Sequence, residues 1–125
     1  MISKLHNLFK NNRLYLFFNN LRYNSIIKDL QNKKKINVIF LINHISQWKY
    51  HSLFNIYKKN NKYSVKVIFI PVDDLSGSYL DKYTFNKKEF SKIGVHLISS
   101  YNTKKKLWKN INKSFSPDII FLIKA

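Results

Sequence analysis

The sequence predicts an α/β fold built on a parallel sheet, and three observations support this class. Apolar segments with the length and composition of buried strands occur four times, at residues 36–42, 65–70, 95–99 and 119–123. Segments with helical periodicity separate them, and the connections are short. We therefore expect four parallel strands flanked by helices, preceded by an N-terminal helical segment.

The handedness of the connections predicts the order of the strands. Right-handed crossovers place successive parallel strands side by side, with helices covering the sheet. We predict a Rossmann-like half with the strand order 3-2-1-4, formed by residues 35–125. The chain has 125 residues, which allows one domain of this kind.

The first strand leads into a turn and a helix. Ser46 suits an N-cap, and Ile45 before it is placed to contact Tyr50 in the first turns of this helix. The apolar residues of the helix recur at i, i+3, i+4 and i+7: Tyr50, Leu53, Phe54 and Tyr57. A buried strand followed directly by such a helix is the opening unit of an α/β sheet.

Two further helices are predicted from their ends. Asn86 and Glu89 fit a capping box, and Gly94 stands where a C′ glycine belongs, so we expect a short helix over residues 86–93. Asn102 or Thr103 suits the cap of a third helix, which Ser116-Pro117 ends. Its expected buried face consists of Leu107, Trp108, Ile111 and Phe115.

Residues 1–34 form a basic amphipathic lead-in, which we expect to be helical with breaks near Asn11-Asn12 and Asn19-Asn20. A basic helix with Phe and Leu on one face is typical of an anchor at a membrane surface. Packing on the domain, or on a missing partner domain, is an equal alternative. The candidate membrane-surface residues are Lys4, Lys10, Arg13 and Arg22.

The net charge of +17 favours an anionic partner such as phosphate, nucleic acid or a membrane surface. Biased nucleotide composition of the coding DNA is an equal explanation, because Lys, Asn and Ile are abundant while Gly and Pro are scarce. There is no cysteine, and the four histidines show no metal-ligand spacing, so we expect no metal site. Without a membrane-spanning run or a signal peptide, a cytoplasmic protein is expected, at most peripheral on the inner face of the cytoplasmic membrane.

Candidate ligand-binding residues follow the first strand. In a sheet of this order, ligands gather at the carboxyl ends of the first and fourth strands. Backbone N–H groups at the start of the following helix are candidates for receiving an anion there. His44 is alternatively an ordinary turn residue, and Trp48 alternatively packs on the sheet. The crevice candidates are Asn43, His44, Ser46 and Trp48.

Other site types have less support in the sequence. Glycine-rich phosphate loops are absent, which argues against a dinucleotide or nucleoside triphosphate cofactor. Asp73 and Asp74 after the second strand are better explained as turn residues than as ribose ligands. We predict no catalytic residue and no cofactor.

The chain resembles the N-terminal domain of the CDP-glycerol:poly(glycerophosphate) glycerophosphotransferase family over about residues 34–122. The similarity lies in an Asn-x-x-S-x-W-x-Y-x-S-L turn and helix, a G-x-x-V strand and a P-D-I-h-F strand. The matching residues are Asn43, Ser46, Trp48, Tyr50, Ser52, Leu53, Gly94, Val95, Pro117, Asp118, Ile119 and Phe121.

This resemblance implies the acceptor-side lobe of a two-lobed GT-B transferase, which moves glycerol phosphate from CDP-glycerol onto a teichoic-acid-like or capsular polymer. In that family the donor nucleotide and the catalytic histidines belong to the C-terminal lobe, which this sequence lacks. We therefore expect an incomplete, truncated enzyme that is inactive alone. Its expected partners are a missing C-terminal lobe, the anionic membrane and a lipid-linked acceptor.

Two other classes remain open. A small basic module that binds nucleic acid or acidic lipid is the first, although nucleic acid is disfavoured because the aromatic residues lie at core spacings. An orphan domain that pairs through its open sheet edge with another chain is the second.

Overall fold

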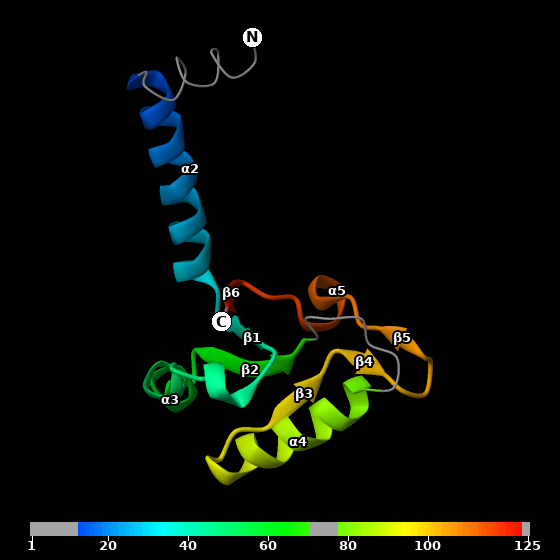
Figure 1. Ribbon diagram of the computed structural model, residues 1–125. Helices are drawn as coiled ribbons and strands as arrows, with labels where there is room; N and C mark the ends of the chain where they lie inside the picture. The colour runs from blue at the N-terminus through cyan, green and yellow to red at the C-terminus, as the bar shows by residue number, and fades with distance from the viewer. Residues whose placement is uncertain (1–12, 71–77, 124–125) are drawn as a thin grey trace. The chain divides into compact units, whose positions relative to one another are not determined.

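The computed structural model describes residues 13–70 and 78–123. The chain divides into two units after Lys34. In its described part the first unit is one helix, α2 (Arg13–Asn32), and the second contains every described strand (Figure 1).

The second unit is built on a four-stranded parallel sheet with the order β3-β2-β1-β6. Since β6 is the fourth of the predicted sheet strands, this confirms the order 3-2-1-4. The apolar composition of the segments explains why β1 is central, because most of its side chains are fully buried. The strands are β1 (Ile36–Ile42), β2 (Tyr63–Phe69), β3 (Leu97–Ser99) and β6 (Ile119–Leu122).

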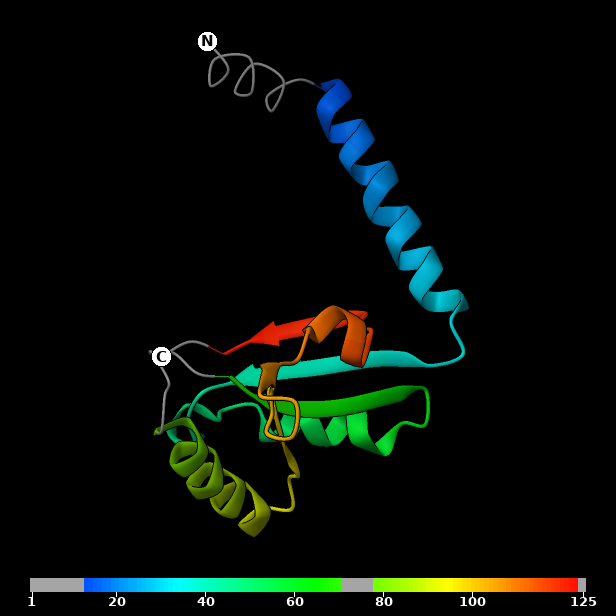
Figure 2. The same ribbon diagram turned by 90° about the vertical axis from the view of Figure 1, so that its right-hand side faces the viewer.

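Helices cover the two faces of the sheet unequally. The register aligns Phe40, Val67 and Leu97 on one face, which α3 (His51–Lys59) and α4 (Ser78–Lys92) cover. Figure 2 shows these two helices on one side of the sheet and the short helix α5 (Ile111–Phe115) on the other. The connections from β1 to β2 and from β2 to β3 therefore lie on one face of the sheet, and the connection from β3 to β6 lies on the other face, as a Rossmann-like half requires.

The outer strand β6 leaves part of the sheet open to solvent. Ile120 and Leu122 face the same side as α5 and are 47% and 54% exposed. Phe121 between them points to the opposite face and stacks on Phe40, with ring centroids 4.9 Å apart. One side of β6 is thus part of the core and the other is an apolar surface.

The first predicted helix begins later than expected. A 3₁₀ turn, η1 (Ile45–Gln47), precedes α3, and the residue at the α3 N-cap is Tyr50. The prediction that Ser46 caps the helix was wrong because the His44 side chain accepts the Ser46 N–H, which draws Ser46 into the 3₁₀ turn. Phe54 is nevertheless the buried residue of α3, as its periodicity predicts.

Helix α4 begins at Ser78, so the capping box at Asn86 was also wrong. Tyr79 and Tyr83 extend the helix toward its N-terminus, where both rings pack on Phe69. The C-terminal prediction was correct: Gly94 has a φ of 76°, and the Val95 N–H donates to the carbonyl of Phe90. With the Gly94 N–H donating to Ser91, this is a Schellman motif.

The third predicted helix is mostly absent. An antiparallel hairpin of β4 (Tyr101–Asn102) and β5 (Leu107–Trp108) replaces its first part, and only α5 is helical. Asn102 closes a turn instead of capping a helix, since its Oδ1 accepts the N–H groups of Lys104 and Lys105. Asn110 caps α5 in its place.

Helix α2 runs without a break through Asn19-Asn20, so the predicted interruption there was wrong; Asn11-Asn12 lies outside the described residues. Apolar residues recur at helical spacing in two sets, starting at Leu14 and at Tyr23. Nine residues are two and a half turns, so the two sets occupy opposite sides of one helix. No helix among the described residues is long and apolar enough to cross a bilayer.

Candidate functional site

The candidate crevice lies at the carboxyl end of β1. The connections of β1 and β6, which are neighbours in the sheet, run on opposite faces, and ligands of parallel α/β sheets usually bind at the carboxyl ends of two such strands. The segment 43–48 leaves β1 at this point. Residues 71–77 and 124–125, which come after β2 and β6 in the sequence, lie outside the described residues. Asp73 and Asp74 are among them.

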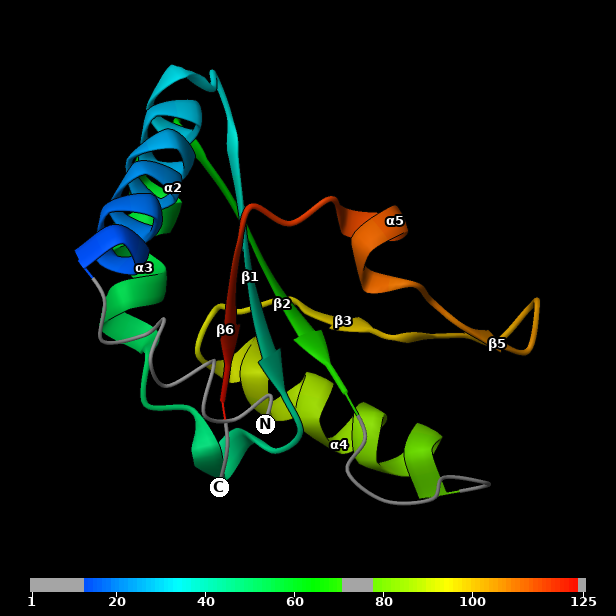
Figure 3. The same cartoon turned by 90° about the horizontal axis from the view of Figure 1, so that it is seen from above.

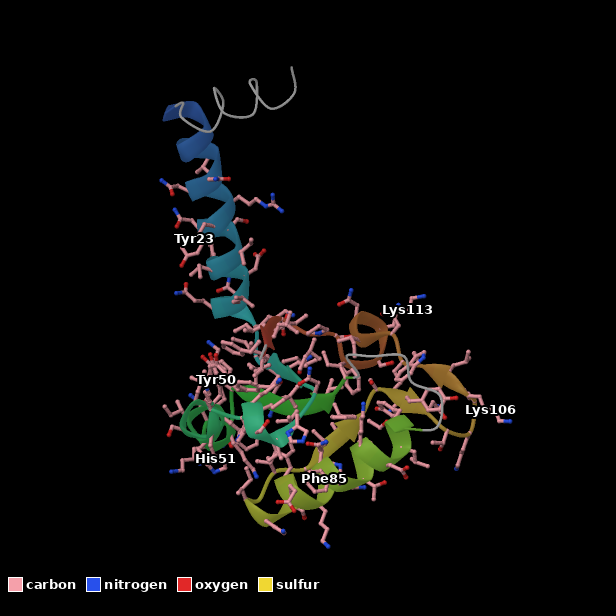
Figure 4. The ribbon with its side chains drawn as sticks, viewed as in Figure 1. Tyr23, Tyr50, His51, Phe85, Lys106 and Lys113 are labelled. Atoms are coloured by element: carbon pink, nitrogen blue, oxygen red, sulfur yellow. The ribbon has the colours of Figure 1, made fainter. Side chains whose placement is uncertain are left out.

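His44 and Ser46 form a small hydrogen-bonded unit in this turn. His44 Nδ1 accepts the Ser46 N–H at 3.1 Å and lies 2.8 Å from Ser46 Oγ. Since Nδ1 is an acceptor, the neutral imidazole carries its proton on Nε2. His44 is exposed, and its ring stacks on Phe85 at 6.0 Å (Figure 4 labels Phe85). The turn can therefore offer an Nε2–H donor to a ligand.

The backbone amides of residues 45–48 are already hydrogen-bonded, which argues against an anion site formed by these four groups. The Ile45 N–H donates to Asn86 Oδ1 at 2.7 Å, and the Ser46 N–H is taken by His44. The N–H groups of Gln47 and Trp48 donate to carbonyls within the turn. A polar group that already has a partner gains little from an anion, so these four amides form no anion-binding nest.

Trp48 packs in the core, as the alternative interpretation predicted. Its ring lies 5.4–5.8 Å from the rings of Phe40, Phe54 and Phe90. Its indole N–H donates to His51 Nδ1 at 3.3 Å, so the one polar atom of the side chain is also satisfied. Trp48 thus links β1, α3 and α4 through its ring contacts with Phe40, Phe54 and Phe90.

Two buried amide oxygens beside the turn have no partner within the part of the chain that the structure describes. Asn43 Oδ1 and Gln47 Oε1 are buried and lack a hydrogen bond among the described residues. A buried acceptor without a donor costs about 1–3 kcal/mol. Sequence reasoning identified Asn43 as a site candidate but missed Gln47, because a glutamine in a polar turn carries no recognisable signal.

Asn86 holds the turn after β1 in position, whereas the sequence analysis assigned it to the cap of a helix. It lies within α4, is 1% exposed, and holds the Ile45 N–H with Oδ1 while Nδ2 donates to the carbonyl of Lys82 at 2.7 Å. The sequence carries no signal for this role, because only the burial of Asn86 in the fold points to a specific hydrogen bond.

The remaining candidates are dispersed. Lys4 and Lys10 lie outside the described residues, as does the side chain of Arg13, while Arg22 is exposed on α2. No three His, Asp or Glu residues in the described part of the chain come together as a metal site. A pocket of about 230 Å³ lies at the amino end of β3, beside Lys87, Gly94 and His96, and none of the crevice candidates lines it.

The residues of the family resemblance have mainly structural roles here. Asp118 Oδ2 accepts the Asn37 N–H at 2.8 Å, and the Asp118 N–H donates to the Asn37 carbonyl, which aligns β6 with β1. Gly94 ends α4 in the left-handed region. Comparison of the chain with known protein families, with curated proteins and with solved structures finds no match.

Proposed function

We propose that the chain is the acceptor-side N-terminal lobe of a CDP-glycerol-type glycerophosphotransferase that acts in the synthesis of a teichoic-acid-like or capsular polymer. In this proposal the chain binds the acceptor at the carboxyl end of β1 and is inactive alone. A C-terminal lobe supplies the CDP-glycerol site and the catalytic groups. The complex works at the inner face of the cytoplasmic membrane, where a lipid-linked acceptor is available.

The observation that carries the proposal is the His44–Ser46 unit at the change of winding. A histidine fixed through Nδ1 presents Nε2–H in a defined direction, and a phosphodiester oxygen is a suitable acceptor for it. Lys49, exposed one residue after Trp48, adds positive charge near the same turn. Both features suit a polymer of glycerol phosphate.

The open side of β6 is consistent with a partner lobe. Ile120 and Leu122 would gain burial from a further layer over this face, and the outer edge of β6 has no neighbouring strand among the described residues. The same surface also agrees with the alternative of an orphan domain that pairs with another chain through its open sheet edge.

A titration of the full chain with a short glycerol-phosphate oligomer tests the proposal. We expect shifts in the backbone amide signals of Asn43, His44 and Ser46, and no comparable shifts with CDP-glycerol. His44→Ala should weaken oligomer binding about fivefold or more, as expected for loss of one charge-assisted hydrogen bond. His96→Ala is the matched control, since His96 is exposed at the amino end of β3.

Three results would contradict the proposal. These are oligomer binding that does not involve the turn, CDP-glycerol binding at the turn, and transfer of glycerol phosphate by the chain alone.

The second candidate is a basic module for acidic lipid or nucleic acid. The net charge of +17 favours it, and so does the lysine-rich hairpin of β4 and β5.

A further inference from the structure

The β4–β5 hairpin gathers positive charge and exposed apolar side chains on one projection of the second unit. Figure 3 shows it extending away from the sheet. Figure 4 labels Lys106 at its turn and Lys113 on the following helix α5. We define the hairpin tip as residues 103–108. We propose that the hairpin tip docks on a bilayer of anionic lipids, independently of the transferase function.

The charge of this region is of one sign. The sequence has no Asp or Glu between Glu89 and Asp118. Each lysine near an anionic bilayer contributes about a fivefold increase in affinity. The lysines of the hairpin tip and the segment after it are Lys104, Lys105, Lys106, Lys109 and Lys113.

The apolar residues of the hairpin tip are of the kinds that enter a membrane interface. Leu107 is 63% exposed and Trp108 is 47% exposed. A leucine inserted among acyl chains loses contact with water, and tryptophan favours the headgroup level. Exposed apolar side chains directly beside three lysines combine the two signals that stable peripheral binding needs.

The base of the hairpin is held firmly, so docking requires little ordering. Tyr79 is buried, and its hydroxyl accepts the Ser100 N–H at 3.1 Å. Its ring packs against Trp108 at 4.9 Å, and the Lys109 N–H donates to the Ser100 carbonyl at 2.7 Å. A preformed loop loses less conformational entropy on binding than a flexible one.

Single-stranded nucleic acid fits the hairpin tip less well than lipid does. Base stacking needs an open aromatic face, whereas the Trp108 ring already contacts the rings of Tyr79 and Tyr101 at 4.9 and 4.8 Å. The most exposed large hydrophobic side chain of the hairpin tip is the aliphatic Leu107, which offers no stacking surface. An aliphatic residue at this position is instead suited to acyl chains.

The test is binding of the full chain to vesicles of phosphatidylcholine with and without about one third phosphatidylserine. Replacing Lys104, Lys105 and Lys106 together by glutamine should weaken binding to the anionic vesicles roughly a hundredfold. The matched control replaces Lys59, Lys82 and Lys88, which are exposed on α3 and α4, and should cost fivefold at most. Both triple variants lower the net charge by three.

A second pair of variants separates insertion from charge. Leu107→Ser should weaken binding about tenfold, while Ile56→Ser, which changes a residue 66% exposed on α3, should leave binding unchanged. Lipids brominated on the acyl chain should quench fluorescence of the native chain, and Trp108→Phe should remove most of that quenching. Circular dichroism confirms that each variant is folded.

Several outcomes would overturn the proposal. No binding of the native chain to anionic vesicles is one, and equal losses in the two triple variants is another, because net charge alone would then explain binding. If Leu107→Ser binds vesicles normally while the hairpin lysines control affinity for a single-stranded oligonucleotide, nucleic acid is the partner instead.

Discussion

Replacing Asn86 by alanine tests whether α4 holds the turn after β1 in place. Asn86 Oδ1 accepts the Ile45 N–H at 2.7 Å, and this bond joins residues 41 positions apart in the chain. Its side chain is 1% exposed, so water cannot replace the lost partner without a change in packing. The turn that carries His44 depends on this contact.

The expected loss follows from two contributions. Loss of the partner of the half-buried Ile45 N–H costs about 1–3 kcal/mol, and the space left by the shorter side chain adds about 1 kcal/mol. The free energy of unfolding of a domain is about 5–15 kcal/mol, so a loss of about 2–4 kcal/mol is a large fraction of it. With a urea m value of about 1–3 kcal/mol/M, the unfolding midpoint should fall by about 1–2 M.

Urea unfolding followed by circular dichroism measures this loss, and amide hydrogen exchange at Ile45 locates it. Thr84→Ala is the matched control, since Thr84 Oγ1 also donates to a carbonyl four residues earlier in α4 but is exposed. The control should change the free energy of unfolding by about 0.5 kcal/mol or less. Equal losses in the two variants, with Ile45 still protected from exchange, would refute the reasoning.

Asn86→Asp sharpens the same test through pH. Burial raises the pKa of the introduced carboxyl above its unfolded value of about 4. The destabilisation should therefore be small below that pH and grow as the pH rises through the folded-state pKa. A loss independent of pH would show that the position is open to water.

Two further predictions concern the unpaired oxygen near the turn and the outer strand. Gln47→Met keeps a similar volume but removes Oε1, which has no partner among residues 13–70 and 78–123, so the free energy of unfolding should rise by about 1 kcal/mol in urea titration. A decrease would mean that Gln47 has a partner in solution. Phe121→Ala should cost about 2–4 kcal/mol because the ring stacks on Phe40, whereas Leu122→Ala should cost about 0.5 kcal/mol or less. Equal costs would show that both sides of β6 are covered.

The sheet could be predicted from local composition. Ile36–Ile42 has no charged residue, and its length and β-branched content match a strand buried on both faces. Once four such strands alternate with helices, the right-handed crossover rule leaves few orders, and the order observed was the one predicted. Gly94 was also predictable, because the left-handed conformation after a helix favours glycine.

The sequence predicted that the candidate residues follow β1 at its carboxyl end, but it did not predict their hydrogen bonds. His44 stands at the change of winding by its place in the sequence, but its bond to the Ser46 N–H depends on the 3₁₀ turn. Ser46 can either cap a helix or donate its N–H to the His44 side chain within a 3₁₀ turn, and the sequence suits both arrangements. The hairpin was missed for a related reason, since Leu107, Trp108 and Ile111 also fit a helical spacing.

The sequence by itself determined the four strands of the parallel sheet and their order, and it placed the turn after β1 at the carboxyl end of that strand, because apolar runs and short connections act locally. Tertiary structure decided which polar groups are paired, which helix starts where, and which apolar side chains reach solvent. Asn86 meets Ile45, and Trp108 meets Tyr79, only after the sheet has brought distant segments together. Contacts of this kind depend on packing between elements, which no local pattern encodes.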